Sequence, residues 1–140
     1  MFLGEYRHAV DSKGRLFIPS KFRSRENQRF FLARGLEKCL FVFPEDEWEK
    51  WQSRIGEMDM MKRDARAFNR FFFAGTAEAI CDRQGRINLP EHLIEYAGLG
   101  KDVVVIGVSS RFEIWSEENW KAYEEESASR YEEIAENLVE

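Results

Sequence analysis

The feature that most constrains the fold of this chain is an internal repeat. Residues 11–19 read DSKGRLFIP and residues 82–90 read DRQGRINLP, so an Asp, a Gly, an Arg and a Pro all recur 71 positions later. Residues 40–48 (LFVFPEDEW) and 112–120 (FEIWSEENW) match in the same order at an offset of 72. Matched blocks in one order at nearly one offset indicate a duplication. The 140 residues are therefore expected to build two similar halves.

The repeat divides the chain into four parts. We expect a first half at 1–55, a connecting helical segment at 56–73, a second half at 74–120 and an acidic helical tail at 121–140. A half of about 50 residues with four short strands has too little interior to be stable alone. The two halves are therefore predicted to share one core, as an intertwined, pseudo-twofold β-barrel. The expected fold class is α+β with a mainly β core.

Local patterns predict the elements of each half. The expected strands lie at 2–10, 15–18, 30–33, 40–43, 103–107 and 111–115. The first two of these strands are expected to form a hairpin around the repeated turn. Short helices are predicted to begin at Pro19, Pro44 and Pro90, because proline suits the first turn of a helix. Gly98 is the expected C-cap of the third helix.

Two longer helices are also expected. Residues 58–73 carry an apolar stripe at helical spacing that includes Phe68 and Phe72. Such a stripe is more typical of a core or an interface than of a binding site. Residues 116–136 are predicted to form one acidic helix, with Ser116 as its N-cap.

Charge is distributed unevenly along the chain. The net charge of −5 argues against nucleic acid, but residues 113–140 hold ten Glu against only Lys121 and Arg130. Residues 1–25, by contrast, hold six basic and two acidic residues. A basic body with an acidic tail points weakly to nucleic acid. A solvated acidic helix on a neutral domain explains the same charges.

Catalytic and metal-binding patterns are weak. His8 and His92 stand in no metal-ligand spacing, and neither Cys39 nor Cys81 has neighbours that would activate a thiol. We interpret both cysteines as structural. The sequence has no G-x-x-x-x-G-K-[ST] loop and no G-x-G-x-x-G loop, which argues against nucleotide binding. We expect no enzymatic activity, no cofactor, no metal and no small-molecule substrate.

The sequence also predicts a compartment. No apolar run approaches the roughly 18 residues of a membrane-spanning helix. The start, MFLGEYRHAV, does not resemble a secretory signal. Two cysteines do not form a disulfide framework, so a reducing cytoplasm is expected.

The repeated turn is the most pointed functional signal. Arg15 and Arg86 directly follow the Gly of their turns, where each begins a strand at the tip of a predicted hairpin. Arginine suits bidentate contact with phosphate or with guanine. In the alternative interpretation, each Asp pairs with its Arg and only fastens the turn. Two copies of the turn beside the basic run 21–25 leave the two interpretations about evenly weighted.

These patterns select a set of candidate residues. The candidate DNA contacts are Arg15, Arg86, Lys13, Arg83, Lys21 and Arg23. The candidate turn-forming residues are Asp11, Gly14, Asp82 and Gly85. The lysines and the remaining arginines would supply the salt-sensitive contacts with phosphates.

The stretch DSKGRLFIPSKFR, after a start that reads MFLGEY, resembles the MraZ family of the AbrB-like, swapped-hairpin superfamily. The second D-x-x-G-R copy, the central helical segment and the acidic closing helix match as well. The resemblance implies two AbrB-like halves in one chain, joined as an intramolecular pseudo-dimer, and a ring-shaped homo-oligomer. It also implies a nucleoid-associated transcriptional regulator. Such a regulator binds short direct repeats upstream of the division and cell-wall gene cluster that contains its own gene.

The resemblance carries the DNA-contacting turn onto Asp11, Lys13, Gly14 and Arg15, and onto Asp82, Gly85 and Arg86. The second copy has Arg83-Gln84 where the first has Ser12-Lys13. The alternative function from the same superfamily is a protein-binding module like its antitoxin members, in which the acidic helix occupies a basic partner.

Overall fold

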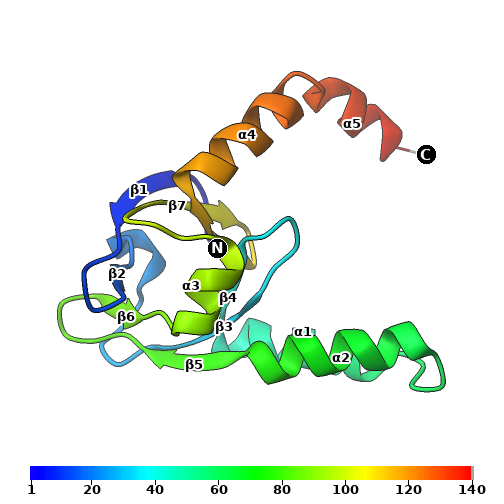
Figure 1. Cartoon of the computed structure of the whole chain (residues 1–140), viewed down its shortest axis with the longest axis horizontal. Coiled ribbons are helices and arrows are strands. Elements are labelled where there is room, and N and C mark those ends of the chain that lie inside the picture. Colours follow the sequence, from blue (N-terminus) through cyan, green and yellow to red (C-terminus); the bar gives the residue numbers. More distant parts are fainter. Residues whose placement is uncertain (140) are drawn as a thin grey trace.

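Short apolar strands separated by tight turns give this chain an α+β fold, seen in a computed structural model that describes residues 1–139 (Figure 1). The first half contains β1 (Glu5–Ala9), β2 (Arg15–Phe17), the 3₁₀ turn η1 (Ser20–Phe22), β3 (Arg29–Arg34), β4 (Leu40–Pro44) and α1 (Glu45–Gly56). The helix α2 (Arg63–Gly75) connects it to the second half. The second half contains β5 (Ala77–Ile80), β6 (Arg86–Asn88), α3 (Glu91–Ala97), β7 (Asp102–Val108) and β8 (Arg111–Ser116). Two helices, α4 (Glu117–Ala128) and α5 (Tyr131–Asn137), follow it.

The strands pair across the repeat. Six of them form one antiparallel sheet in the order β1-β7-β8-β4-β3-β5, and β2 pairs with β6 in a separate two-stranded ribbon. Replacing each strand by its repeat equivalent (β1 by β5, β3 by β7, β4 by β8) gives the same order read from the other edge. The first strand of each half therefore pairs with a strand of the other half, and the halves interlock.

The predicted hairpin between the first two strands does not form. β1 pairs with β7, and only an isolated bridge from Val10 to Leu16 joins its end to β2. The repeated turn reverses the chain, but Leu16 lies opposite Ile87 at the centre of the ribbon, and both side chains are buried there. The first strand is also shorter than 2–10, because Gly4 has a φ of 96° and interrupts the extended backbone before Glu5.

Local hairpins agree better with the sequence. β3 pairs with β4, and β7 pairs with β8, which confirms the strand pairs predicted within each half. Gly98 ends α3 with a φ of 62°, as expected for a C-cap. The helix predicted at Pro19 is only the single turn η1, whereas the helix that follows Pro44 has 12 residues.

Both longer helices differ from their predicted bounds. The central helix begins at Arg63 rather than 58, because Asp59 first closes a turn by accepting a hydrogen bond from the backbone N–H of Met61. The acidic segment 116–136 is broken into α4 and α5. At the break the Ser129 hydroxyl donates to the carbonyl of Glu126, a local bond that competes with continued helix. Ser116 caps α4 as expected, since its Oγ accepts from the backbone N–H of Asn119 at 3.0 Å.

Two apolar clusters hold the molecule together. One lies between the six-stranded sheet and the β2–β6 ribbon, and it contains residues of both halves, including Leu16, Phe30, Ile87 and Phe112. The two halves therefore share this core, as predicted. The second cluster packs the helices against the sheet: Trp48 of α1 stacks on Phe31, with ring centroids 5.0 Å apart, and on Phe72 of α2. Phe72 is buried in this cluster and Phe68 packs against it, partly buried, which agrees with the core or interface role predicted for the apolar stripe.

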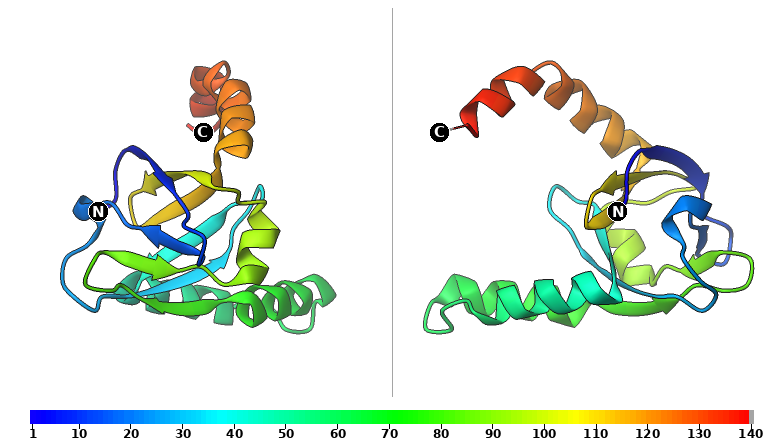
Figure 2. Two further views of the ribbon diagram at one scale, coloured as in Figure 1. Left: turned by 60° about the vertical axis from the view of Figure 1, so that its left-hand side comes forward. Right: turned by 180° about the vertical axis from the view of Figure 1, so that it is seen from behind.

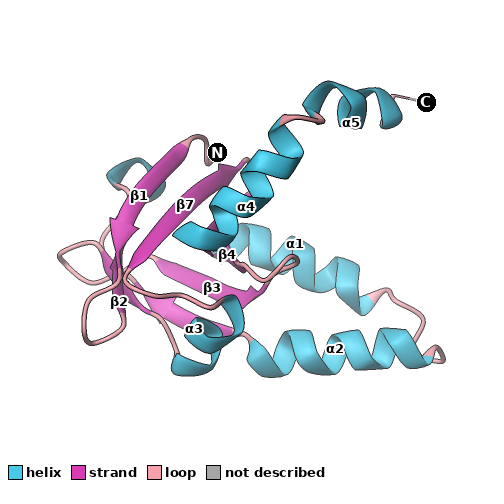
Figure 3. Cartoon of the chain, turned by 45° about the horizontal axis from the view of Figure 1, so that its top comes forward, coloured by secondary structure: helices cyan, strands magenta, loops and turns pink. Residues whose placement is uncertain are grey.

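The helices project from the strands. In Figures 2 and 3, α1 and α2 lie side by side as one arm, while α4 and α5 form a second arm that leaves the body separately. The two turns at 11–15 and 82–86 lie at the opposite end of the molecule from both arms (Figure 1). Among residues 1–139, no helix has the length and apolar character needed to cross a bilayer.

Candidate nucleic-acid interface

The first repeated turn is held by its own aspartate. The Asp11 Oδ1 accepts hydrogen bonds from the backbone N–H groups of Lys13 and Arg15, each at 2.9 Å. The backbone N–H of Gly14 donates to the Asp11 carbonyl at 3.0 Å, and Gly14 has a φ of 77°. A side chain at this φ would be strained, which explains the glycine. Finally, Arg15 Nε donates to Asp11 Oδ2 at 2.7 Å.

The second turn repeats this arrangement bond for bond. The Asp82 Oδ1 accepts from the backbone N–H groups of Gln84 and Arg86, each at 2.9 Å, and Gly85 has a φ of 82°. Arg86 Nε donates to Asp82 Oδ2 at 3.0 Å. The duplicated sequence therefore produces duplicated local geometry, although the two middle residues of the turns differ.

The carboxylates are stabilised in their charged form. The backbone hydrogen bond from Arg15 holds the pKa of Asp11 below its ordinary value, and the guanidinium of Arg15 adds to this effect. The backbone hydrogen bond from Arg86 lowers the pKa of Asp82 in the same way. Each turn is therefore fastened by an ionised Asp over the neutral pH range.

Each turn is also locked to the other half. The carbonyl of Gly85 accepts from the backbone N–H of Ile18, and the carbonyl of Gly14 accepts from Leu89, both at 2.8 Å. Between these bonds, Arg15 lies opposite Asn88 and Phe17 lies opposite Arg86. The ribbon thus brings the two repeated arginines together on neighbouring strands.

Alternation along the ribbon sorts its side chains onto two faces. Leu16 and Ile87 point into the core, with exposed fractions of 0% and 1%. The residues on either side of them point outward, since successive side chains of a strand alternate between faces. The outer face consists of Arg15, Phe17, Arg86 and Asn88.

The arginines on this face retain binding capacity. Each uses Nε for its own Asp, and no hydrogen bond or ion pair within residues 1–139 engages the terminal nitrogens of either guanidinium. About 29% of the Arg15 side chain and 28% of the Arg86 side chain are exposed. Each arginine can therefore both fasten its turn and bind a ligand, because Nε holds the guanidinium to its Asp while the terminal nitrogens remain available.

The remaining candidates differ in their surroundings. Lys13 and Arg83 are exposed within their turns, and Lys21 is exposed on η1. Arg23 is half-buried: its Nε donates to the Ile18 carbonyl at 2.9 Å, and its guanidinium lies 4.8 Å from the centroid of the Phe17 ring. The structure thus places three of these cations at the surface and engages the fourth inside the fold.

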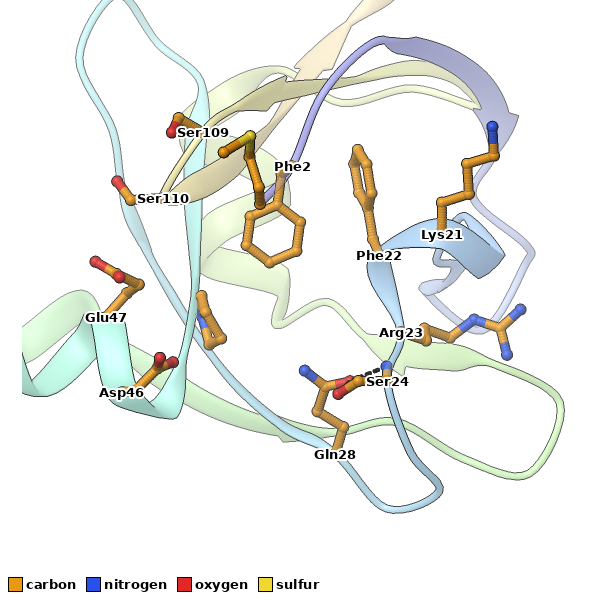
Figure 4. A pocket seen from close by; sticks show the side chains of 12 residues that line it. Phe2, Lys21, Phe22, Arg23, Ser24, Gln28, Asp46, Glu47, Ser109 and Ser110 are labelled. Atoms are coloured by element: carbon orange, nitrogen blue, oxygen red, sulfur yellow. Dashed lines mark hydrogen bonds between the residues drawn. The ribbon is translucent and has the colours of Figure 1, made fainter.

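Lys21 and Arg23 also border a pocket (Figure 4). Asp46 and Glu47 of α1 line the same pocket from its far side, where they would repel a phosphate. The pocket is therefore a poor anion site, and the outer face of the ribbon is the better candidate.

Phe17 and Asn88 were not among the residues that the sequence singled out. Both stand three residues after the Gly of their turn, between the two apolar residues of LFI and INL, where the repeat varies. The alternation apolar–variable–apolar in both copies was the available signal that these side chains share a face with the arginines.

The cysteines carry no comparable site. Cys39 and Cys81 are free thiols, 0% and 2% exposed. Burial raises the pKa of both thiols, so neither is an activated nucleophile at neutral pH. This agrees with the structural role expected for them.

Fold and turns together define a class of protein: a single chain folded as an internal pseudo-dimer, whose halves exchange strands and each contribute one Asp-x-x-Gly-Arg turn to a common ribbon. The amino-acid sequence is also similar to known proteins. The family model for MraZ protein matches the chain twice, over residues 1–71 and 72–140. The chain belongs to the MraZ family.

Full-length relatives are similar throughout. A protein of Natranaerobius thermophilus is 50% identical over 140 residues, one of Heliobacterium modesticaldum is 49% identical, and one of Syntrophomonas wolfei is 51% identical. Each alignment covers 100% of this chain and 98% of the relative. All three relatives carry the name transcriptional regulator MraZ.

Proposed function

We propose that this protein is a sequence-specific DNA-binding transcriptional regulator, without enzymatic activity, that acts in the cytoplasm in association with the nucleoid. Its expected sites are short direct repeats upstream of the division and cell-wall gene cluster that includes its own gene. The observation that carries the proposal is the β2–β6 ribbon, which presents Arg15 and Arg86 on one outer face. The names of the three relatives support regulation of transcription.

The ribbon has a suitable size and chemistry for the major groove. B-DNA admits a two-stranded β-ribbon in that groove, and arginine there makes bidentate contacts with guanine. Arg15 and Arg86 take this role, each oriented by its Asp. Lys13, Arg83 and Lys21 contact phosphates from the flanks of the ribbon and supply the salt-dependent part of the affinity.

The fold proposed for this function is the AbrB-like swapped-hairpin barrel, here closed within one chain. Its halves are residues 1–55 and 74–120, with 56–73 as the connection and 121–140 as the acidic tail. The exchange of β1 and β5 between halves, and the two matches of the family model, support this assignment.

The protein is also proposed to assemble with copies of itself into a ring. An apolar groove between α2, α3 and the β3–β4 loop includes Phe71, which is 69% exposed, and Leu36, which is 61% exposed. Tyr131 and Ile134 of α5, together with its C-cap residue Leu138, follow at helical spacing. The residues that flank these two surfaces are oppositely charged: Arg63, Arg66 and Arg70 on α2, and Glu132, Glu133 and Glu136 on α5. We place α5 of one copy in the groove of the next.

A binding experiment tests the function directly. The probe is a fluorescent duplex that contains the DNA immediately upstream of this chain's own coding sequence, titrated with the parent protein and with Arg15→Ala. Loss of a bidentate guanine contact is worth about 1–3 kcal/mol, which is roughly a 5- to 150-fold weaker Kd. Arg86→Ala should weaken binding in the same direction.

Lys121→Ala is the matched control, because it removes one positive charge from α4, away from the ribbon. It should change the Kd by less than about twofold. If Arg15→Ala binds like the parent, Arg15 only fastens its turn. If the parent protein itself does not bind the duplex, the protein-binding module, with the acidic helix as the contact surface, becomes the better interpretation.

A further inference from the structure

The outer face of the β2–β6 ribbon is symmetric in its arginines but not in its other two residues. Arg15 and Arg86 are equivalent in the repeat, and so are Phe17 and Asn88. Both members of the second pair are exposed, Phe17 to 39%. The duplication keeps the two arginines identical, but the second pair differs, with Phe in one copy and Asn in the other. The outer face therefore has two unlike ends.

The register defines these ends. Arg15 lies directly opposite Asn88, and Phe17 lies directly opposite Arg86. Directly opposite side chains have Cβ atoms about 4.5–5.5 Å apart, and the two pairs are separated by about 6.6 Å along the strands. Base pairs stack at about 3.4 Å. One end of the face therefore offers Arg with Asn, and the other end offers Arg with Phe, to positions about two base pairs apart.

The two unlike residues favour different bases. The Asn amide can donate and accept at once, which suits the N6 and N7 atoms of adenine. A Phe ring has no donor or acceptor in this position and suits apolar contact with the thymine methyl group. Asn88 makes no side-chain hydrogen bond within residues 1–139, so its amide is available to a ligand.

The side chains that pack behind the ribbon also differ between its two ends. A Cβ on Gly85 would lie 2.5 Å from the guanidinium of Arg23, whereas a Cβ on Gly14 would lie 3.7 Å from the Cδ1 of Ile94. Arg23 and Ile94 are equivalent in the repeat. Arg23 also stacks on Phe17. The end of the ribbon that carries Phe17 is therefore packed against a charged side chain, whereas the turn at Gly14 is packed against the apolar side chain of Ile94.

We infer that Asn88 and Phe17 set the orientation of the ribbon on each direct repeat: they make its two ends read different bases, so that one chain binds a non-palindromic sequence in a single orientation. The inference rests on the proposed function. A true twofold dimer reads a palindrome, because each half meets the same sequence. Here the duplication within one chain has removed that constraint.

Selection from a randomised duplex pool, followed by sequencing, tests the inference and does not require the operator to be known. The parent protein should enrich a motif without inverted symmetry. Phe17→Asn makes the outer face symmetric, and it should shift the enriched motif toward an inverted repeat. Asn88→Ala should reduce discrimination against single-base substitutions at one end of the parent motif by at least fivefold, and should leave the other end unchanged.

Gln52→Ala, which removes an exposed amide from α1, is the matched control and should leave the motif as it is. Thermal unfolding of each variant shows whether the ribbon is intact. Asn88 is exposed, so Asn88→Ala keeps the test valid if Phe17→Asn proves unstable. A palindromic parent motif, or a motif unaltered by Asn88→Ala, would overturn the inference while sequence-specific binding stands. If the parent enriches no motif, the proposed function itself fails.

Discussion

The two turn glycines offer a sharp test of the structure, because they share a backbone conformation but not a neighbourhood. Gly14 and Gly85 have φ values of 77° and 82°. A Cβ on Gly14 would meet only the Leu89 carbonyl at 3.4 Å and Ile94 at 3.7 Å, which are ordinary contacts. A Cβ on Gly85 would lie 2.5 Å from Cζ and Nη1 of Arg23. Alanine should therefore be worse tolerated at Gly85.

The expected magnitudes follow from these contacts. Left-handed backbone costs a non-glycine residue about 1–2 kcal/mol, which applies to both substitutions. At Gly85 the Arg23 side chain must also move, and it loses its bond to the Ile18 carbonyl and its stacking on Phe17. For a half-exposed cation these are worth about 1–2 kcal/mol together. We expect Gly14→Ala to cost about 1–2 kcal/mol and Gly85→Ala about 2–4 kcal/mol.

Urea unfolding followed by tryptophan fluorescence measures both free energies. A double-mutant cycle with Arg23→Ala isolates the cause, because contacting residues couple and distant ones do not. In that background Gly85→Ala should cost about as little as Gly14→Ala. Equal costs in the parent background, or a Gly85→Ala cost unchanged by Arg23→Ala, would refute the role given to Arg23 behind the second turn.

Three further outcomes are expected. The folded-state pKa of Asp11 lies below its ordinary value of 3.8. Its carboxylate therefore stabilises the fold above that pH, and this stability is lost as the pH falls further. In urea unfolding, Asp11→Asn should reduce the decline of the unfolding midpoint between pH 5 and pH 3. Gly107→Ala places a Cβ against the backbone of Leu3 and should detach the N-terminal segment. Because Phe2 is only 7% exposed, this variant should lose about 1.5–3 kcal/mol in calorimetry. In DNA titrations at several salt concentrations, Lys13→Ala should make the slope of log affinity against log salt shallower by about 0.9, as expected for one lost phosphate contact; an unchanged slope would remove Lys13 from the interface.

Local signals predicted much of the fold. The β3–β4 and β7–β8 pairs follow from apolar strands joined by short loops, and Gly98 and Ser116 terminate and cap their helices as their residue types suggest. The choice of partner for the first two strands could not be predicted in this way. A turn determines that the chain reverses, but the pairing of Leu16 with Ile87 depends on burial between segments 71 residues apart.

The candidate site, like the fold, could be predicted only in part from the sequence. The Asp, Gly and Arg of each turn were identifiable because a tight turn restricts its residue types. Phe17 and Asn88 lay at variable positions of the repeat, and only the ribbon register places them beside the arginines. Arg23 belonged to a basic run, and its proximity to Gly85 arises from tertiary packing alone.

Strand exchange has a consequence for how this protein is made. A ribosome adds about 5–20 residues per second, so the 71 residues that separate β2 from β6 take roughly 4–14 s to synthesise. During that interval the nascent first half exposes β1 and β2 with their partners still missing. Neighbouring ribosomes on one message hold identical unpaired strands, which are competent to pair with each other. Joining both halves in one polypeptide counters this hazard once synthesis is complete, because the correct partner strand is then present in the same molecule at a high effective concentration.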